Sequence, residues 1–276
     1  MNKFLIFTDA RTGSISLSKI VSDLYKSKPT IPHKVVTEPF GKTGFGIYYP
    51  DLHRKLKPEL AHLGEDSYKI PLKNIGKILD TCYQFSNGVK HIWSHLDVED
   101  KFQNEFVLNY AIRNKIKIIL LHREDFVLRA ISLILSHQSE VWSVESPQER
   151  DRVEKAEYES VDIDGLEKII KEYNHYLFRY RKLLEPFNYY DISYEDFFKV
   201  GYKGPDKRGE QMKEIDKICK FLGSNKKFLT EEVSSFSLSG ERKQNTRVTY
   251  NKIPNIVEII KYAEEKWDKD LSWILK

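Results

Sequence analysis

A run of small and polar residues follows the first apolar stretch of the chain. The apolar residues 4–7 are followed by Asp-Ala-Arg-Thr-Gly-Ser-Ile-Ser at positions 9–16, and a helical pattern begins at Ser14. Arg11 carries a permanent positive charge, and Gly13 lets the backbone come close to a ligand. Helix N-termini at strand ends of parallel sheets bind anions. The segment is therefore predicted to hold a phosphate-like group, with Arg11 as its cation.

The loop differs from the phosphate loop of the common ATPases and kinases. That loop ends in Gly-Lys-Ser/Thr and carries a second glycine five residues earlier, and this chain has neither feature. The hydroxyls of Ser14 and Ser16 could instead contact an anion. A purely structural interpretation also stands, in which Ser14 caps the helix and Gly13 makes a tight turn.

A second cationic segment follows the most apolar run of the chain, residues 117–121. It begins His-Arg-Glu-Asp at position 122, and Arg129 and Ser132 follow at helical spacing. An arginine at a strand end and a serine on the next helix can bind one phosphate together. Arg123 and Ser132 are therefore predicted phosphate ligands. The alternative is that Arg123 pairs with a nearby acid and Ser132 has no ligand role.

Strand-like and helical stretches alternate along the chain, which predicts an α/β fold with a mainly parallel sheet flanked by helices. No repeat of fixed period is visible, and a single domain over 1–276 is expected. Apolar runs predict strands at 4–7, 89–93, 117–121 and 189–193, and apolar residues at helical spacing predict helices within 14–26, 106–111, 126–134 and 166–180.

Composition narrows the classes of function. The 276 residues carry a net charge of +4 and give an isoelectric point near 8.7, which is less basic than expected of a dedicated nucleic-acid binder. Cys82 and Cys219 define neither a metal site nor a disulfide framework. No run approaches the roughly 18 apolar residues of a membrane span, and Asp9 interrupts the first apolar run too early for a signal peptide. A cytoplasmic protein is expected.

Two segments interrupt the alternating pattern. Residues 143–164 are dense in charged side chains, and residues 201–209 form a loop rich in glycine, proline and lysine. Either could be an ordinary surface excursion. The first follows a predicted binding helix, so it could also act as a mobile cover over a substrate.

Four motifs in order resemble the sulfotransferases that use 3′-phosphoadenosine 5′-phosphosulfate (PAPS). They span residues 3 to about 258, and the second is similar to bacterial carbohydrate sulfotransferases of the trehalose and nodulation-factor types. The motifs are Arg11-Thr12-Gly13-Ser14 with Glu38-Pro39-Phe40; the stretch His122–Trp142 with Arg123, Ser132 and Gln138; Tyr194-Glu195-Asp196-Phe197; and Lys243-Gln244-Asn245 with Asn255.

The resemblance implies a role for each matching residue. Arg11, Thr12, Gly13, Ser14, Ile15 and Ser16 would hold the 5′-phosphosulfate, and Arg123 with Ser132 the 3′-phosphate. Tyr194 would lie near the adenine, and Lys243 near the 3′-phosphate or the mouth of the site. Two departures stand out: many relatives have lysine where Arg11 stands and threonine where Ile15 stands, so some donor contacts are expected to be absent here.

Sulfuryl transfer to a hydroxyl requires a base, and Glu38 is the candidate. Its Glu-Pro-Phe motif resembles the segment that supplies the catalytic carboxylate in the trehalose enzyme, although a surface glutamate before a proline turn is the alternative. His33, His53 and His122 are second choices, since histidine titrates near neutral pH. Arg11 would stabilise the charge of the leaving group. No metal is expected, because no suitable spacing of ligands occurs.

Two other functions stay open on the sequence alone. A nucleotide-dependent kinase would also combine a parallel sheet with a phosphate-binding loop, although the missing Gly-Lys-Ser/Thr counts against it. A non-enzymatic basic module for sulfated glycan or nucleic acid is compatible with the charge. The predicted partners are the nucleotide donor and a hydroxyl-bearing acceptor, a glycan or glycolipid by resemblance.

Overall fold

The computed structural model describes residues 2–23, 35–40, 70–96, 101–142, 144, 146–198, 208–224 and 245–275. These residues belong to two compact units. Unit 1 consists of Met1–His122 and Tyr180–Phe236, and unit 2 of Arg123–Arg179 and Ser237–Lys276. The predicted single domain over 1–276 stays a prediction.

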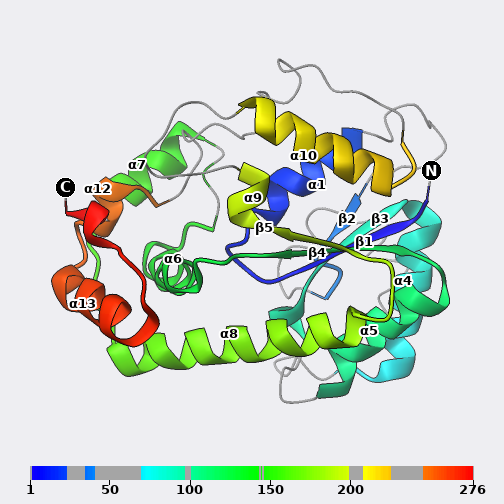
Figure 1. The fold of residues 1–276 in the computed structure, drawn as a ribbon, viewed down its shortest axis with the longest axis horizontal. Coiled ribbons are helices and arrows are strands. Elements are labelled where there is room, and N and C mark those ends of the chain that lie inside the picture. Colours follow the sequence, from blue (N-terminus) through cyan, green and yellow to red (C-terminus); the bar gives the residue numbers. More distant parts are fainter. Residues whose placement is uncertain are drawn as a thin grey trace. The chain divides into compact units, whose positions relative to one another are not determined.

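Unit 1 is built on a sheet whose five described strands are all parallel, in the order β2-β3-β1-β4-β5 (Figure 1). Strands β1 and β3 are buried along their whole length and β4 along almost all of it, as expected when helices cover a parallel sheet on two sides. The mainly parallel sheet predicted from the sequence is confirmed. The strands are β1 (Phe4–Thr8), β2 (Val35–Thr37), β3 (Gly88–Ile92), β4 (Lys117–His122) and β5 (Tyr190–Ser193).

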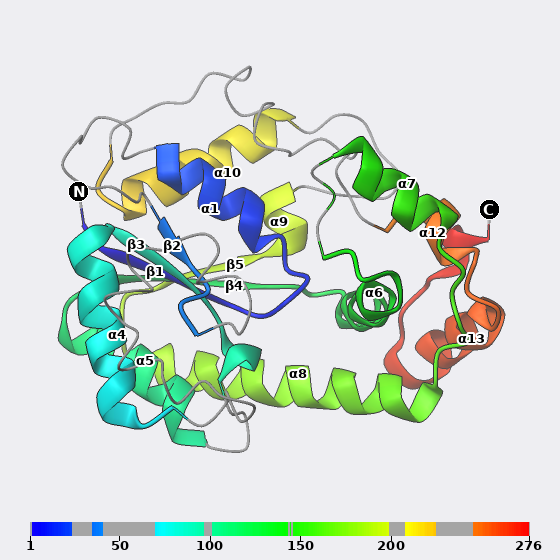
Figure 2. The same cartoon turned by 180° about the vertical axis from the view of Figure 1, so that it is seen from behind.

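Helices flank both faces of this sheet. Figures 1 and 2 show α1, α9 and α10 on one face and α4 and α5 on the other. The described helices of unit 1 are α1 (Ser14–Asp23), α4 (Leu72–Phe85), η1 (Trp93–His95), α5 (Lys101–Arg113), α9 (Tyr194–Phe198) and α10 (Arg208–Phe221), and α8 (Ile163–Leu184) contributes its last residues.

Aromatic side chains pack at the carboxyl ends of β1 and β3. The ring of Phe7 lies 5.5 Å from that of Trp93 and 4.9 Å, edge on, from that of Tyr180. His91 packs between Phe7 and Phe40, with ring centroids 5.4 and 5.2 Å away. This packing gives the strand ends a rigid support, which matters because the predicted site residues follow them directly.

The regular elements of unit 2, in its described part, are all helices. An apolar cluster joins α6, the first part of α8, and α13, and includes Leu128, Ile170 and Ile259. The side-chain amide of Asn255 accepts from the backbone N–H of Val161 and donates to its carbonyl, both at 2.9 Å. The described elements of unit 2 besides α8 are α6 (Phe126–Ser139), α7 (Pro147–Lys155), α12 (Arg247–Tyr250), α13 (Ile256–Trp267) and η3 (Ser272–Ile274).

The charged segment 143–164 contains α7, which lies beside α12 (Figure 2). Helix α7 begins with a capping box, in which Ser146 and Glu149 satisfy each other's backbone N–H groups. A role of this segment as a mobile cover stays a prediction.

Among the described helices, none combines the length and apolarity that a membrane crossing demands.

Candidate functional site

The loop after β1 joins the strand to α1 as the sequence predicted. Its interior is held by hydroxyls: Thr12 Oγ1 donates to the carbonyl of Asp9 at 2.8 Å and lies 2.5 Å from Thr8 Oγ1, which donates to the Leu121 carbonyl at 2.8 Å. Thr12 is fully buried. Its side chain therefore shapes the loop and is not presented to solvent.

Two residues of this loop have left-handed backbone conformations. Arg11 has φ 68° and Gly13 has φ 78°. A Cβ atom on Gly13 would lie 2.4 Å from the Phe198 ring and 3.0 Å from the Tyr194 ring, so glycine is required by space as well as by φ. For a residue with a side chain, such as Arg11, the left-handed form costs about 1–2 kcal/mol. Strain of this kind concentrates at functional sites.

The first turn of α1 presents the predicted anion site. The N–H groups of the first residues of a helix have no partner within the helix, and the helix dipole adds positive potential there. Ser14 is buried, Ser16 is half-buried, and Ile15 is 38% exposed, so its apolar side chain points to solvent. Tyr194, the predicted adenine contact, lies against Gly13 in the same unit.

Glu38 follows the carboxyl end of β2 and is tied twice to Lys90 in β3. Its backbone N–H donates to the Lys90 carbonyl at 2.7 Å, and its Oε1 accepts from the Lys90 ammonium. Lys90 is only 2% exposed, while Glu38 retains 30%. Burial alone would raise the pKa of Glu38, but the charges of Lys90 and, more weakly, His95 hold that pKa below its ordinary value.

The residues beyond β3 connect Glu38 to the anion loop. Ser94 Oγ donates to Asp9 Oδ1 at 2.8 Å, and the same oxygen accepts from the backbone N–H of Ala10, also at 2.8 Å. His95 lies in the electrostatic field of Glu38 and Asp9, and its pKa is lowered, chiefly by burial. The carboxyl ends of three adjacent strands, β1, β3 and β2, thus form one polar site.

Sequence reasoning missed Lys90, Ser94 and His95. A signal existed for Lys90, because it is a charged residue within the predicted strand 89–93. Its partner is 52 positions away in the chain, so periodicity could not find the pair.

Arg123 and Ser132 are buried polar residues of unit 2, and each has its own hydrogen-bond partner. The backbone N–H of Arg123 donates to the Tyr173 hydroxyl at 2.7 Å, and the guanidinium of Arg129 lies 4.1 Å from the centre of the Tyr173 ring. Ser132 Oγ accepts from the Asn245 amide at 2.8 Å. All five side chains are buried, which is unusual for arginine. The sequence placed Arg129 in the same cationic segment as Arg123 and Ser132, but it did not single out Tyr173. Lys243 lies outside the described residues.

The second-choice bases have different outcomes. His33 and His53 lie outside the described residues. His122 ends β4, and its Nε2 lies 2.6 Å from Arg181 Nη2 and 3.0 Å from Asp191 Oδ1. Arg181 Nε also donates to Asp191 Oδ2 at 2.8 Å. His122 is therefore engaged in a charge network with its imidazole buried, an arrangement typical of a structural role.

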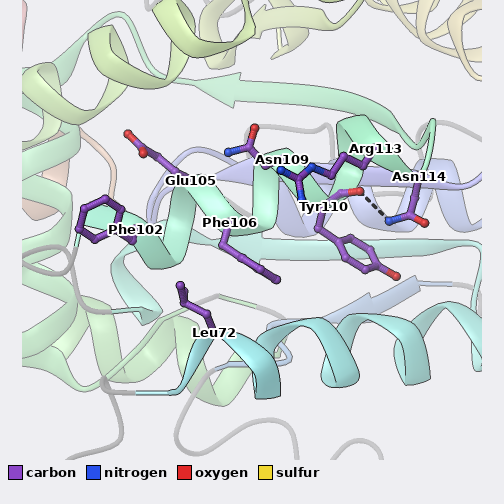
Figure 3. Close-up of a pocket in the computed structure, with 8 residues that line it drawn as sticks. All are labelled: Leu72, Phe102, Glu105, Phe106, Asn109, Tyr110, Arg113 and Asn114. Atoms are coloured by element: carbon purple, nitrogen blue, oxygen red, sulfur yellow. Dashed lines mark hydrogen bonds between the residues drawn. The ribbon is translucent and has the colours of Figure 1, made fainter.

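A surface cavity of about 390 Å³ lies between α4 and α5, apart from the strand-end residues. Figure 3 shows its aromatic and polar lining, in which the Asn114 amide donates to the Tyr110 carbonyl at 2.9 Å. The Tyr110 hydroxyl donates to Asp80. None of the predicted site residues lines this cavity. Its lining residues are Leu72, Phe102, Glu105, Phe106, Asn109, Tyr110, Arg113 and Asn114.

The described residues contain no group of three or more metal-ligating side chains placed to share an ion.

Comparisons with known proteins matched this chain to solved structures only. No family model and no curated protein matches the chain. The crystal structure of a sulfotransferase from Alicyclobacillus acidocaldarius is 14% identical, with a TM-score of 0.42 over 100% of this chain and 99% of that chain. The sulfotransferase domain from the curacin biosynthetic pathway is 12% identical, with a TM-score of 0.40 over 98% and 91%. Likenesses at this level carry no argument about activity, so the function of this chain has to be inferred from its own residues.

Proposed function

We propose that this chain is a sulfotransferase that moves a sulfuryl group from PAPS to a hydroxyl of a carbohydrate or glycolipid-type acceptor. One observation carries the proposal: the predicted anion loop and the predicted base follow strands of one parallel sheet. The intervening strand β3 and the helix η1 that follows it connect them through the Lys90–Glu38 ion pair and the Ser94–Asp9 hydrogen bond. Ligand sites of parallel sheets lie at this edge.

The loop after β1 is suited to the phosphosulfate end of the donor. Arg11 and the free N–H groups at the start of α1 would stabilise charge on the 5′-phosphate oxygen as the S–O bond to it breaks. The leaving group is then adenosine 3′,5′-bisphosphate (PAP). Gly13, whose Cβ position is occupied by aromatic rings, allows the backbone to approach the donor. Tyr194 is proposed to contact the adenine.

Glu38 is suited to take the proton of the acceptor hydroxyl. The new bond forms between the acceptor oxygen and sulfur, and the proton moves to the carboxylate as attack proceeds. A base has to be ionised to act, and the lowered pKa of Glu38 keeps it ionised throughout the neutral range. Positioning and charge stabilisation account for the rest of catalysis, as in phosphoryl transfer.

The roles of the other predicted donor ligands are proposed from the resemblance. Arg123 and Ser132 would contact the 3′-phosphate, and arginine is well suited to bind its oxygens in bidentate fashion. Both residues are buried and each has a polar partner, Tyr173 for Arg123 and Asn245 for Ser132, which supports a built polar site. Lys243 is proposed to act near the same phosphate.

A transfer assay tests the proposed function. The wild type and Glu38→Gln would be incubated with ³⁵S-labelled PAPS and a panel of oligosaccharides and glycolipids, and labelled products separated by chromatography. We expect label on at least one acceptor with the wild type and none above background with Glu38→Gln. Transfer of ³²P from ATP to the same panel, without any sulfuryl transfer, would overturn the proposal in favour of a kinase.

A further inference from the structure

We propose that Lys90 is a positioning residue for Glu38: it holds one oxygen of the carboxylate so that the other can accept the acceptor's proton. This inference rests on the proposed sulfuryl transfer. It concerns a residue that carries no recognisable motif and that no comparison singles out.

The location of Lys90 is unusual for a lysine. It lies in the middle of β3, in register with Ile6 of β1 on one side and Thr37 of β2 on the other. Its side chain is 2% exposed, whereas lysine is almost never fully buried unless it is paired. An apolar residue at this position would avoid the desolvation of an ammonium group. We therefore expect the charge of Lys90 to serve a function.

Lys90 fixes both the backbone and the side chain of Glu38. The Lys90 carbonyl accepts the Glu38 N–H at 2.7 Å, and the Lys90 ammonium binds Glu38 Oε1. Glu38 has φ 55°, a left-handed conformation that few residues with a side chain adopt. Two contacts from one residue thus hold the carboxylate in a single orientation at the end of β2.

This arrangement leaves the second carboxylate oxygen of Glu38 open. Within the part of the chain that the structure describes, hydrogen bonds reach Oε1 from Lys90 and none reaches Oε2. The side chain also retains 30% exposure although its partner is buried. One oxygen fixed and one accessible is the arrangement that a general base needs.

The pH dependence of catalysis separates positioning from mere structural support. Lys90, His95 and, through His95, Asp9 are the charged or titratable groups that act on Glu38 from the neighbouring strand ends. Without Lys90, burial would raise the pKa of Glu38, because burial disfavours the charged carboxylate. The acidic limb of kcat/KM then moves to higher pH, so activity falls at low pH and recovers at high pH. A structural role predicts an equal loss at every pH.

The experiment measures kcat/KM against pH for sulfuryl transfer by the wild type, Lys90→Met and Lys90→Arg. Lys217→Met serves as matched control, since Lys217 pairs with Glu214 at 2.8 Å but is 64% exposed. We expect the acidic limb of Lys90→Met to shift upward by at least about one pH unit. Lys90→Arg should restore most of the wild-type profile, and Lys217→Met should leave it unchanged.

A second readout keeps this inference distinguishable from the proposed function. The Glu38 carboxyl can be titrated by ¹³C NMR in labelled protein and assigned by its loss in Glu38→Gln. We expect an apparent pKa below 4.5 in the wild type and a higher one in Lys90→Met. A wild-type value at or above 4.5 overturns the inference even if Lys90→Met does not fold, and so does an unchanged pH profile in an active Lys90→Met. Failure of the wild type to bind PAP or to transfer sulfuryl groups overturns the proposed function instead.

Discussion

Two carboxylates in unit 1 are paired with cations, and they are paired differently. Glu38 contacts Lys90 through Oε1 alone. Asp191, on β5, is engaged through both oxygens: Oδ2 accepts from Arg181 Nε at 2.8 Å, while Oδ1 lies 3.0 Å from His122 Nε2 and 3.3 Å from Arg181 Nη2. The pKa of each carboxyl is lowered, since cations outweigh the burial that would raise it.

The difference shows that a lowered pKa does not by itself identify a base. Asp191 is ionised at neutral pH, as Glu38 is, but both of its oxygens already accept hydrogen bonds from Arg181. Glu38 combines ionisation with an accessible oxygen and a position at the strand end next to the anion loop. The same comparison explains why His122, a plausible base from the sequence, is better understood as part of a structural network.

Removal of the Glu38 charge should give the largest effect in the molecule. We expect Glu38→Gln to lower kcat by about 10²–10⁴-fold, the usual contribution of a general base, while Asp191→Asn keeps most of the activity. The measurement is the initial rate of ³⁵S transfer at saturating donor, with circular dichroism as a check of folding.

The Glu38→Gln variant leaves the Lys90 ammonium buried with a neutral partner, which could reduce stability. The double variant Glu38→Gln/Lys90→Met removes both charges and serves as control. Loss of turnover has to persist in the folded double variant. Full activity in either variant would remove Glu38 as the base and with it the contrast to Asp191.

Among the residues of the loop after β1, Arg11 should contribute most to the affinity for the donor. We expect Arg11→Ala to weaken PAP binding by about 10- to 100-fold, because a hydrogen bond to a charged group contributes about 1.5–3 kcal/mol. Isothermal titration calorimetry measures the change. Lys261→Ala, which removes a cation that is 74% exposed on α13, is the control and should bind as the wild type does. Equal affinities in the two variants would contradict the loop assignment.

Asp191 should matter for stability rather than for turnover. Asp191→Asn removes the charge that Arg181 and His122 share, and we expect it to lower the free energy of unfolding by about 1–3 kcal/mol. Urea unfolding followed by circular dichroism gives this value. Unchanged stability together with reduced kcat would reverse the roles of the two carboxylates.

The pH dependence of stability should distinguish the contributions of the carboxylates Glu38 and Asp191 from that of the buried His91. The folded-state pKa of His91 is lowered to about 3, chiefly by burial, so the unfolded chain takes up a proton that the fold excludes as pH falls from 6.5. Stability should therefore decline by up to about 1.4 kcal/mol per pH unit through His91. Glu38 and Asp191 have depressed values, so their contributions are full above 4.5 and 3.8 respectively and are lost on further acidification.

A His91→Gln variant tests this separation. Its free energy of unfolding, measured in urea between pH 7 and 5, should depend less on pH than that of the wild type, whatever the change in absolute stability. The Nε2 of His91 lies 2.7 Å from Asn104 Oδ1, and glutamine can still donate there. An unaltered slope would show that His91 does not carry the titration.

The predictable parts of the site are those whose chemistry is local in sequence. The loop at 9–16 could be predicted as an anion site because Arg11, Gly13 and Ser14 stand between an apolar run and a helical pattern. Glu38 was predicted as the base only through a motif, since nothing in its local pattern distinguishes it from a surface residue.

The remaining parts depend on contacts between distant segments. Lys90 meets Glu38 through strand pairing, and Tyr173 meets Arg123 from a helix 50 positions away. The sheet order β2-β3-β1-β4-β5 likewise arises from packing, because alternating strands and helices predict a parallel sheet but not which strands are neighbours. Thr12 was predicted as a ligand by position, yet its hydroxyl is turned into the loop, which only the fold could reveal.

The most direct test of the central claim is the affinity of the wild type for PAP beside ADP, ATP and NAD. Isothermal titration calorimetry at matched salt would measure all four, with Arg11→Ala as the second protein. PAP is expected to bind at least about tenfold more tightly than the other three nucleotides, and this preference should fall in Arg11→Ala. Tighter binding of ATP, or no binding of PAP at all, would contradict the central claim.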